Sequence, residues 1–147
     1  MRKALFIVLS ILLLSGCDIN PPSEPSLSVS EVSPDDVDGG VLSFFQSVQD
    51  ENGVYLYFDN ENDAMYIYLN GSNVIDGEEA TYFTDFDIEE EDDMLKLSYT
   101  SEQTTDYSDQ SLDYERFYKI ISDQDYEGIK LYGNGQEVSF DTVSGNP

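Results

Sequence analysis

Residues 53–70 read GVYLYFDNENDAMYIYLN, two runs in which aliphatic or phenylalanine side chains alternate with tyrosine, joined by a polar segment. Successive side chains of a β-strand point to opposite faces of its sheet. A loop over residues 59–64 would place Phe58 opposite Met65, Leu56 opposite Ile67 and Val54 opposite Leu69. The stretch therefore predicts an antiparallel hairpin with one face of tyrosines and one face without them.

Two further hairpins follow from the same test. A loop over residues 89–94 pairs Ile88 with Leu95, Phe86 with Leu97 and Thr84 with Tyr99. Asn134-Gly135 is the favoured dipeptide of a type I′ turn, and it places Leu131 opposite Val138 and Ile129 opposite Phe140. Residues 115–121 supply another strand after a polar segment, 101–113, which we expect to be a mobile loop. The fold class predicted is all-β, a single small antiparallel β-sandwich or meander barrel of about seven strands.

The part before the first hairpin divides in two. Four of the five prolines lie in residues 17–40, among Ser, Asp and Glu, which predicts a disordered acidic tether. A short edge strand over Leu27, Val29 and Val32 is the alternative there. Val41, Phe44, Phe45 and Val48 recur at helical spacing and predict one short helix at the start of a β domain spanning residues 41–147.

Composition limits the available chemistry. The chain has no histidine and a single cysteine, Cys17. Histidine-dependent triads, Cys or His zinc sites and disulfides within the chain are therefore excluded. Carboxylate, Tyr, Ser and Lys side chains remain, and no pattern among them indicates an active site. We expect a protein that is not an enzyme.

The first seventeen residues have the pattern of an export signal. Arg2 and Lys3 precede an uncharged, mainly apolar run over residues 4–14, and Leu14-Ser15-Gly16-Cys17 closes it. The apolar run is shorter than the ~20 residues that a membrane-spanning helix needs. The ending resembles the lipobox of bacterial lipoprotein precursors. The resemblance implies that residues 1–16 are a signal peptide, that Cys17 receives a diacylglyceryl group, and that the mature chain begins there.

The same resemblance implies a location, a lipid anchor on the extracytoplasmic face of the cell membrane. Asp18 directly after the lipidated cysteine also resembles the inner-membrane retention signal of some Gram-negative lipoproteins. A Gram-positive envelope is the other arrangement. Both place the β domain outside the cytoplasmic membrane.

The charge of the mature chain restricts its partners. From residue 17 onward the chain has 4 basic and 31 acidic residues, so its formal charge is 4 minus 31, or −27. Such a surface repels nucleic acid and predicts a cationic or envelope protein partner. Adaptation to a salty or alkaline exterior, collection of divalent cations and docking of a basic protein all explain the acidity.

Two clusters in the β domain are candidate sites. Tyr55, Tyr57, Tyr66 and Tyr68 would form a ladder of rings that binds a partner, or else pack beneath another layer of the protein. Asp123, Asp125 and Glu127 alternate before Gly128, as at the start of a calcium loop, which makes Ca²⁺ the one cofactor suggested. The twelfth position of that loop is Asn134 and not Glu, so a plain acidic turn is the alternative.

Three functions are compatible with these features. The first is a partner-binding module without catalysis. The second is a small-ligand carrier with a lipocalin-like barrel, which needs an empty apolar cavity of several hundred cubic ångströms. The third is a low-affinity binder of divalent cations.

Overall fold

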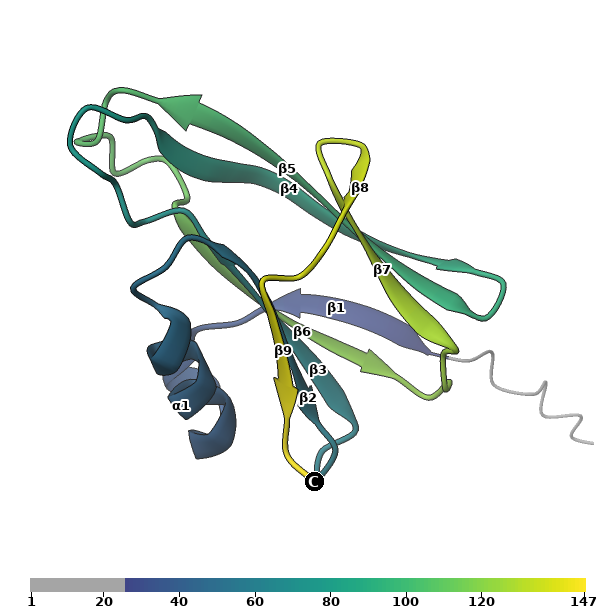
Figure 1. Ribbon diagram of the computed structural model, residues 1–147. Coiled ribbons are helices and arrows are strands. Elements are labelled where there is room, and N and C mark those ends of the chain that lie inside the picture. The colour runs from purple at the N-terminus through teal and green to yellow at the C-terminus, as the bar shows by residue number, and fades with distance from the viewer. Residues whose placement is uncertain (1–25) are drawn as a thin grey trace, which may run out of the picture.

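The computed structural model describes residues 26–147, so the predicted signal peptide, the predicted lipid site at Cys17 and residues 18–25 of the predicted tether lie outside the described residues. The elements of the described part are β1 (Leu27–Glu31), a 3₁₀ turn η1 (Pro34–Asp36), α1 (Gly39–Val48), β2 (Gly53–Asp59), β3 (Ala64–Asn70), β4 (Ala80–Glu91), β5 (Met94–Thr104), β6 (Glu115–Ser122), β7 (Gly128–Gly133), β8 (Gln136–Val138) and β9 (Thr142–Gly145). Figure 1 shows two sheets with α1 on the outer face of one of them. The all-β prediction is confirmed.

The two sheets have separate edges. The first sheet has the order β1-β6-β3-β2-β9 and the second β4-β5-β7-β8. Because β1 and β9 end one sheet and β4 and β8 end the other, the strands form an open sandwich and not a closed barrel. The alternative of a lipocalin-like barrel is therefore wrong. Within residues 26–147 no helix is long and apolar enough to cross a membrane.

The β2–β3 hairpin has the predicted register. Phe58 pairs with Met65, Leu56 with Ile67 and Val54 with Leu69. Asn134 and Gly135 have φ values of 50° and 80°, as a type I′ turn requires, and Leu131 pairs with Val138. The strand ends at Val138, so the predicted pair of Ile129 with Phe140 does not form.

The β4–β5 hairpin is longer than predicted. Ile88 pairs with Leu97 and Phe86 with Tyr99, a shift of two residues, because the turn tightens to Asp92 and Asp93. A shift of two keeps each side chain of residues 85–91 on its face, so the apolar pattern alone does not distinguish the two registers there. An irregularity between Phe83 and Asp85 then moves the register by one residue, and Phe83 is buried in the core with Leu95 and Leu97. The strand β5 also continues to Thr104, into the predicted loop.

Two strand pairs are parallel, which the antiparallel prediction missed. The pairs are β2 with β9 and β5 with β7. In each case the chain crosses from one sheet to the other just before the second strand: β6 precedes β7, and β8 precedes β9. A strand that arrives by such a crossover is free to pair in either direction, unlike one that follows a tight hairpin turn.

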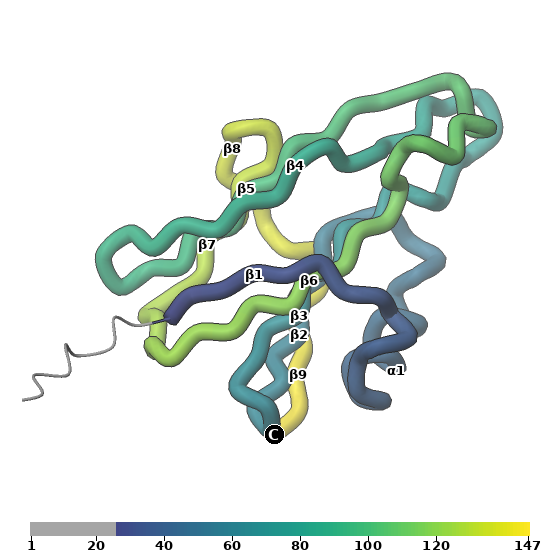
Figure 2. Tube along the Cα trace, turned by 180° about the vertical axis from the view of Figure 1, so that it is seen from behind, coloured from purple at the N-terminus to yellow at the C-terminus, as the bar shows by residue number. Residues whose placement is uncertain are grey.

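The predicted tether is partly folded. The edge strand β1 pairs with β6, from Leu27 opposite Ser122 to Glu31 opposite Tyr118, so the alternative of a short strand is correct. The predicted helix is confirmed, although it begins at Gly39. The folded domain therefore begins at β1 and not at Val41 (Figure 2).

Two apolar clusters hold the layers together. The first lies between the sheets and is formed by Val54, Leu56, Ile67, Leu69, Phe83, Leu95, Leu97, Tyr118, Ile120 and Leu131. The second lies between α1 and the first sheet and contains the four tyrosines. The central strands β2 and β3 thus bury both of their faces.

Candidate binding groove

The tyrosine face is covered by α1. Tyr55, Tyr57, Tyr66 and Tyr68 are between 1 and 7 % exposed. The ring of Phe45 lies 5.4 Å from that of Tyr68 and 6.5 Å from that of Tyr66, centroid to centroid. This burial agrees with the alternative that the rings pack beneath another layer of the protein, and not with an exposed binding surface, since the helix occupies the place that a partner would need.

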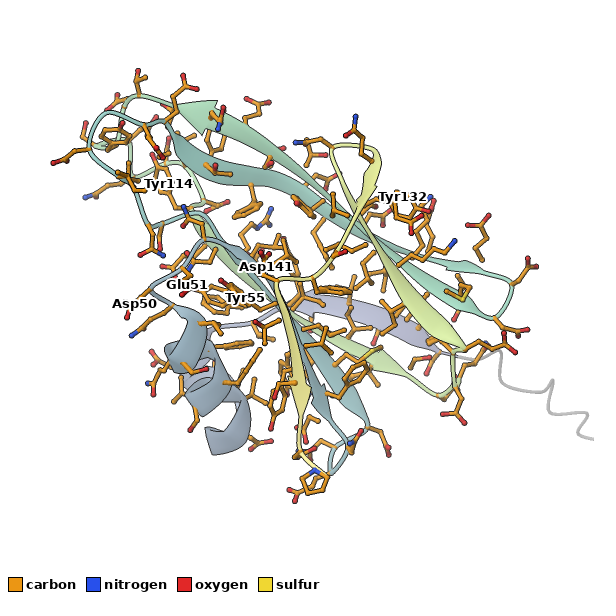
Figure 3. All side chains as sticks on the ribbon, viewed as in Figure 1. Asp50, Glu51, Tyr55, Tyr114, Tyr132 and Asp141 are labelled. Atoms are coloured by element: carbon orange, nitrogen blue, oxygen red, sulfur yellow. The ribbon has the colours of Figure 1, made fainter. Side chains whose placement is uncertain are left out.

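The hydroxyls of Tyr55 and Tyr68 are hydrogen-bonded. Tyr55 Oη donates to the carbonyl of Glu51 at 2.8 Å, and Tyr68 Oη donates to the Glu115 carboxylate. Burial raises the pKa of Tyr55, and the charges of Asp141 and Glu51 raise it further. Figure 3 shows Tyr55 beside Glu51 and Asp141. The tyrosine face is therefore a packed interior surface.

The three predicted calcium ligands separate into two roles. Asp123 Oδ1 accepts a hydrogen bond from the backbone N–H of Ser26 at 2.8 Å and so fastens the start of the domain to the β6–β7 loop. Asp125 and Glu127 are exposed and line a groove between the sheets. No group of three or more acidic, His or Cys side chains within residues 26–147 is arranged to hold a metal ion.

That groove, here called the interlayer groove, has a volume of about 530 Å³ and opens between the two sheets at one end of the sandwich. It is lined by Leu56, Phe58, Asp59, Asn60, Asp63, Ala64, Met65, Ser122, Gln124, Asp125, Tyr126, Glu127, Gly128, Ile129, Phe140 and Val143. The volume lies within the usual range for ligand pockets.

The floor of the groove is apolar because of strand alternation. Leu56, Phe58 and Met65 lie on the inner face of the β2–β3 hairpin, opposite to the tyrosines. In the parallel pair of β2 with β9, Val143 stands beside Leu56 and remains 53 % exposed. Ile129 on β7 faces the same space from the second sheet. Leu56 is buried, and the partly exposed side chains present apolar surface that a ligand can remove from water, namely Phe58, Met65, Ile129 and Val143.

The rim of the groove is acidic. Asp59, Asp63, Asp125 and Glu127 line it, and no Lys or Arg is among the lining residues. Like charges so close together attract a cation. The rim and floor together suit a ligand with a positive charge beside an apolar group.

One wall of the groove is fixed by Tyr126 in the β6–β7 loop. Its hydroxyl donates to Glu90 Oε1 at 2.5 Å and lies 2.9 Å from Ser122 Oγ. Burial raises the pKa of Tyr126, and its hydrogen bond to Glu90 raises it further. The ring thus links the loop to strand β4 of the second sheet and holds the wall in place.

Asp59 stabilises the turn beneath the rim. It is 2 % exposed, and its two carboxylate oxygens accept hydrogen bonds from Asn62 Nδ2 at 2.8 Å and Asn146 Nδ2 at 3.0 Å. These hydrogen bonds, that from Asn62 above all, hold the pKa of Asp59 below its usual value against the opposing effect of burial. The group is therefore ionised at neutral pH and adds negative charge at the groove.

Sequence reasoning found two of the groove's acids, Asp125 and Glu127, but assigned them to a metal loop. It missed the rest because the groove joins residues from β2, β3, β7 and β9 that meet only through the parallel pairs. One local signal for the groove was the pair of apolar residues near the C-terminus, Phe140 and Val143, which stand among polar neighbours.

Comparisons with known proteins offer no relative for this arrangement. The sequence matches no protein-family model and no curated protein, and the chain matches no solved structure.

Proposed function

We propose that this protein is a lipid-anchored, extracytoplasmic lipoprotein whose β-sandwich binds a cationic protein partner in the interlayer groove, without catalysis. The observation that carries the proposal is the combination of an apolar floor with an acidic rim that contains no basic side chain. The partner's contact segment carries Lys or Arg next to an apolar residue.

The physical argument has two parts. Burial of apolar surface contributes roughly 25 cal/mol per Å² and supplies most of the affinity. The acidic rim and the formal charge of the mature chain, 4 minus 31 or −27, speed association and select against acidic segments. Such binding weakens as salt screens the exposed charges.

A second candidate is a carrier of a small apolar cation. The volume of about 530 Å³ favours it, since a drug-sized molecule fits such a space. Native mass spectrometry of the purified protein distinguishes the two. A carrier retains a small cationic molecule, whereas a partner-binding module shows the mass of the lipidated chain alone.

The binding test uses the full-length protein extracted from membranes in detergent. The probe is a fluorescent peptide of leucine and lysine, compared with its leucine and glutamate counterpart. We expect saturable binding of the lysine peptide only. The double variant Asp125→Asn/Glu127→Gln should bind about tenfold more weakly, because it removes two rim charges worth roughly 0.5–1 kcal/mol each.

The matched control is Glu79→Gln/Asp87→Asn, which also removes one Glu and one Asp charge, but from exposed positions outside the groove. It should leave the affinity within about twofold. Equal loss in both double variants would mean that net charge and not the groove binds the peptide, which contradicts the proposal.

The anchor is tested separately with labelled palmitate. We expect the label on the wild-type chain and none on Cys17→Ala, with the wild type in the membrane fraction. An unlabelled wild-type chain would refute the lipoprotein part of the proposal and leave the groove untouched.

A further inference from the structure

The described chain begins at the wall of the interlayer groove. The backbone N–H of Ser26 is held by Asp123, and Leu27 pairs with Ser122, which lines the groove. Whatever precedes Ser26 therefore enters the domain beside the β6–β7 loop.

The tip of the β4–β5 hairpin lies at the same end of the sandwich. The backbone N–H of Glu127 donates to the carbonyl of Asp93 at 2.8 Å, and Met94 pairs with Gly128. Figures 1 and 2 show the start of β1, the β6–β7 turn and the β4–β5 turn together at one end. The acidic run Glu89–Asp93 is thus placed close to Asp123, Asp125 and Glu127.

The sequence limits how far this end can stand from the membrane. Eight residues, 18–25, separate Cys17 from Ser26. A chain of this length spans at most about 30 Å when fully extended. Strand β5, with its 11 residues, is longer, at about 35 Å. With a lipid on Cys17, such a tether is too short for the domain to turn end over end, which favours an orientation with the groove end toward the bilayer.

Charge then selects what lies between the domain and the bilayer. The acidic end of the sandwich and an anionic phospholipid surface repel each other, and both attract basic segments. Exposed charges interact only over about the Debye length, which is about 8 Å. A basic segment must therefore contact the acidic end and the phospholipid surface together to be attracted by both. Residues 18–25 contain acids and no Lys or Arg, so the tether itself is a poor occupant of the groove.

These observations lead to one inference, which rests on the proposed function. We propose that the interlayer groove faces the membrane and takes cationic amphipathic peptides that lie on its surface. Such a peptide has lysines or arginines on one face and apolar side chains on the other. The apolar side chains fit the floor formed by Phe58, Met65 and Ile129, and the basic ones meet Asp125 and Glu127 at the rim.

The test uses the full-length lipidated protein in vesicles of phosphatidylglycerol and phosphatidylethanolamine. The probe is a helical peptide of leucine and lysine in which one leucine carries a photoreactive group. We expect crosslinks to Met65, Ile129 and Phe140, and a yield about tenfold lower in Asp125→Asn/Glu127→Gln than in the Glu79→Gln/Asp87→Asn control. Crosslinks confined to α1 or to the outer face of β4 would overturn the inference.

A longer tether tests the membrane-facing geometry itself. Twenty Gly and Ser residues inserted after Ser23 should lower the capture of vesicle-bound peptide about sixfold, because effective concentration falls as roughly the −3/2 power of linker length. Binding of the same peptide in detergent should be unchanged. Undiminished capture by the long-tether variant would contradict the inference.

The measurements in detergent and on vesicles distinguish a failure of this inference from a failure of the proposed function. Binding in detergent without capture on vesicles removes the membrane-facing geometry and leaves the proposed function standing. An absence of groove-dependent binding in both settings removes both.

Discussion

The two faces of the β2–β3 hairpin have opposite fates, although the same alternating sequence makes them. The tyrosine face is covered by α1, and its four rings are between 1 and 7 % exposed. The opposite face is buried around Leu56 and Ile67 but open at Phe58 and Met65, where the interlayer groove lies. The four tyrosine rings therefore lie in the interior of this protein, and the open part of the opposite face is apolar with an acidic border.

The difference shows what alternation in a strand specifies. It determines which side chains share a face, and it leaves open what covers that face. Here the cover is a helix of ten residues on one side and a second sheet that spans only part of the other. The three variants that follow test this contrast, in order of decreasing effect.

The largest effect should come from the covered face. Phe45→Ala removes a ring that is 3 % exposed and packs on Tyr68 and Phe117. We expect it to lower the free energy of unfolding by about 3–5 kcal/mol, because it leaves a cavity beneath the helix. Urea denaturation measures the change.

Val143→Ala is its control on the open face, and a loss of about 0.5 kcal/mol or less is expected there because the side chain is 53 % exposed. A loss below about 1 kcal/mol for Phe45→Ala would show that α1 contributes little to the fold.

An intermediate loss of stability is expected at the turn that joins β2 to β3. Asp59→Asn places an amide donor against the donors of Asn62 and Asn146 and should cost about 1–3 kcal/mol. Asp63→Asn, on the same turn but exposed, should change stability by about 0.5 kcal/mol or less. Equal effects of the two variants would contradict the structural role of Asp59.

Acid should abolish the contribution of Asp59 to the stability of the fold. Because its pKa is lower in the fold than the ordinary value of 3.8, ionised Asp59 stabilises the fold above that pH. The contribution is lost as pH falls through the lowered pKa. The stability difference between wild type and Asp59→Asn should therefore be constant near neutrality and shrink below about pH 4. A difference that grows on acidification would have the wrong sign.

The smallest effect should be a gain of stability in the core between the sheets. The hydroxyl of Tyr118 is buried, and it has no hydrogen-bond partner among the atoms of residues 26–147. Burial raises the pKa of Tyr118 to about 12. Tyr118→Phe should therefore increase the free energy of unfolding by up to about 1 kcal/mol, since it removes an unpaired polar group.

This gain should widen with pH. The neutral hydroxyl is favoured in the fold, so the wild type loses stability between about pH 10, the ordinary pKa of tyrosine, and its folded pKa. The variant lacks that loss. Tyr132→Phe on β7 is the control (Figure 3), and a destabilised Tyr118→Phe would indicate that the hydroxyl is paired after all.

The local sequence pattern predicted the hairpins and the helix well, but it predicted only part of how they assemble. The alternation around Leu56 and Ile67, the Asn134-Gly135 turn and the spacing of Phe44 and Phe45 specified two hairpins and the helix correctly. Each of these depends on neighbours in the chain.

The groove depends on distant partners. Val143 meets Leu56 through a parallel pair formed after the chain crosses between the sheets, and no local pattern encodes that pairing. The same limit explains the tyrosines: the sequence placed them on one face, and only the packing of α1 shows that the face is interior.

The central claim is that the apolar, acid-bordered interlayer groove is the binding surface and the tyrosine face is not. Methyl NMR of the full-length protein in detergent, titrated with the leucine and lysine peptide, tests it most directly. The account predicts saturable shifts at Met65, Ile129 and Val143, which line the groove, and none at Val41 on the buried face of α1. Shifts at Val41 with the groove methyls unmoved would contradict it.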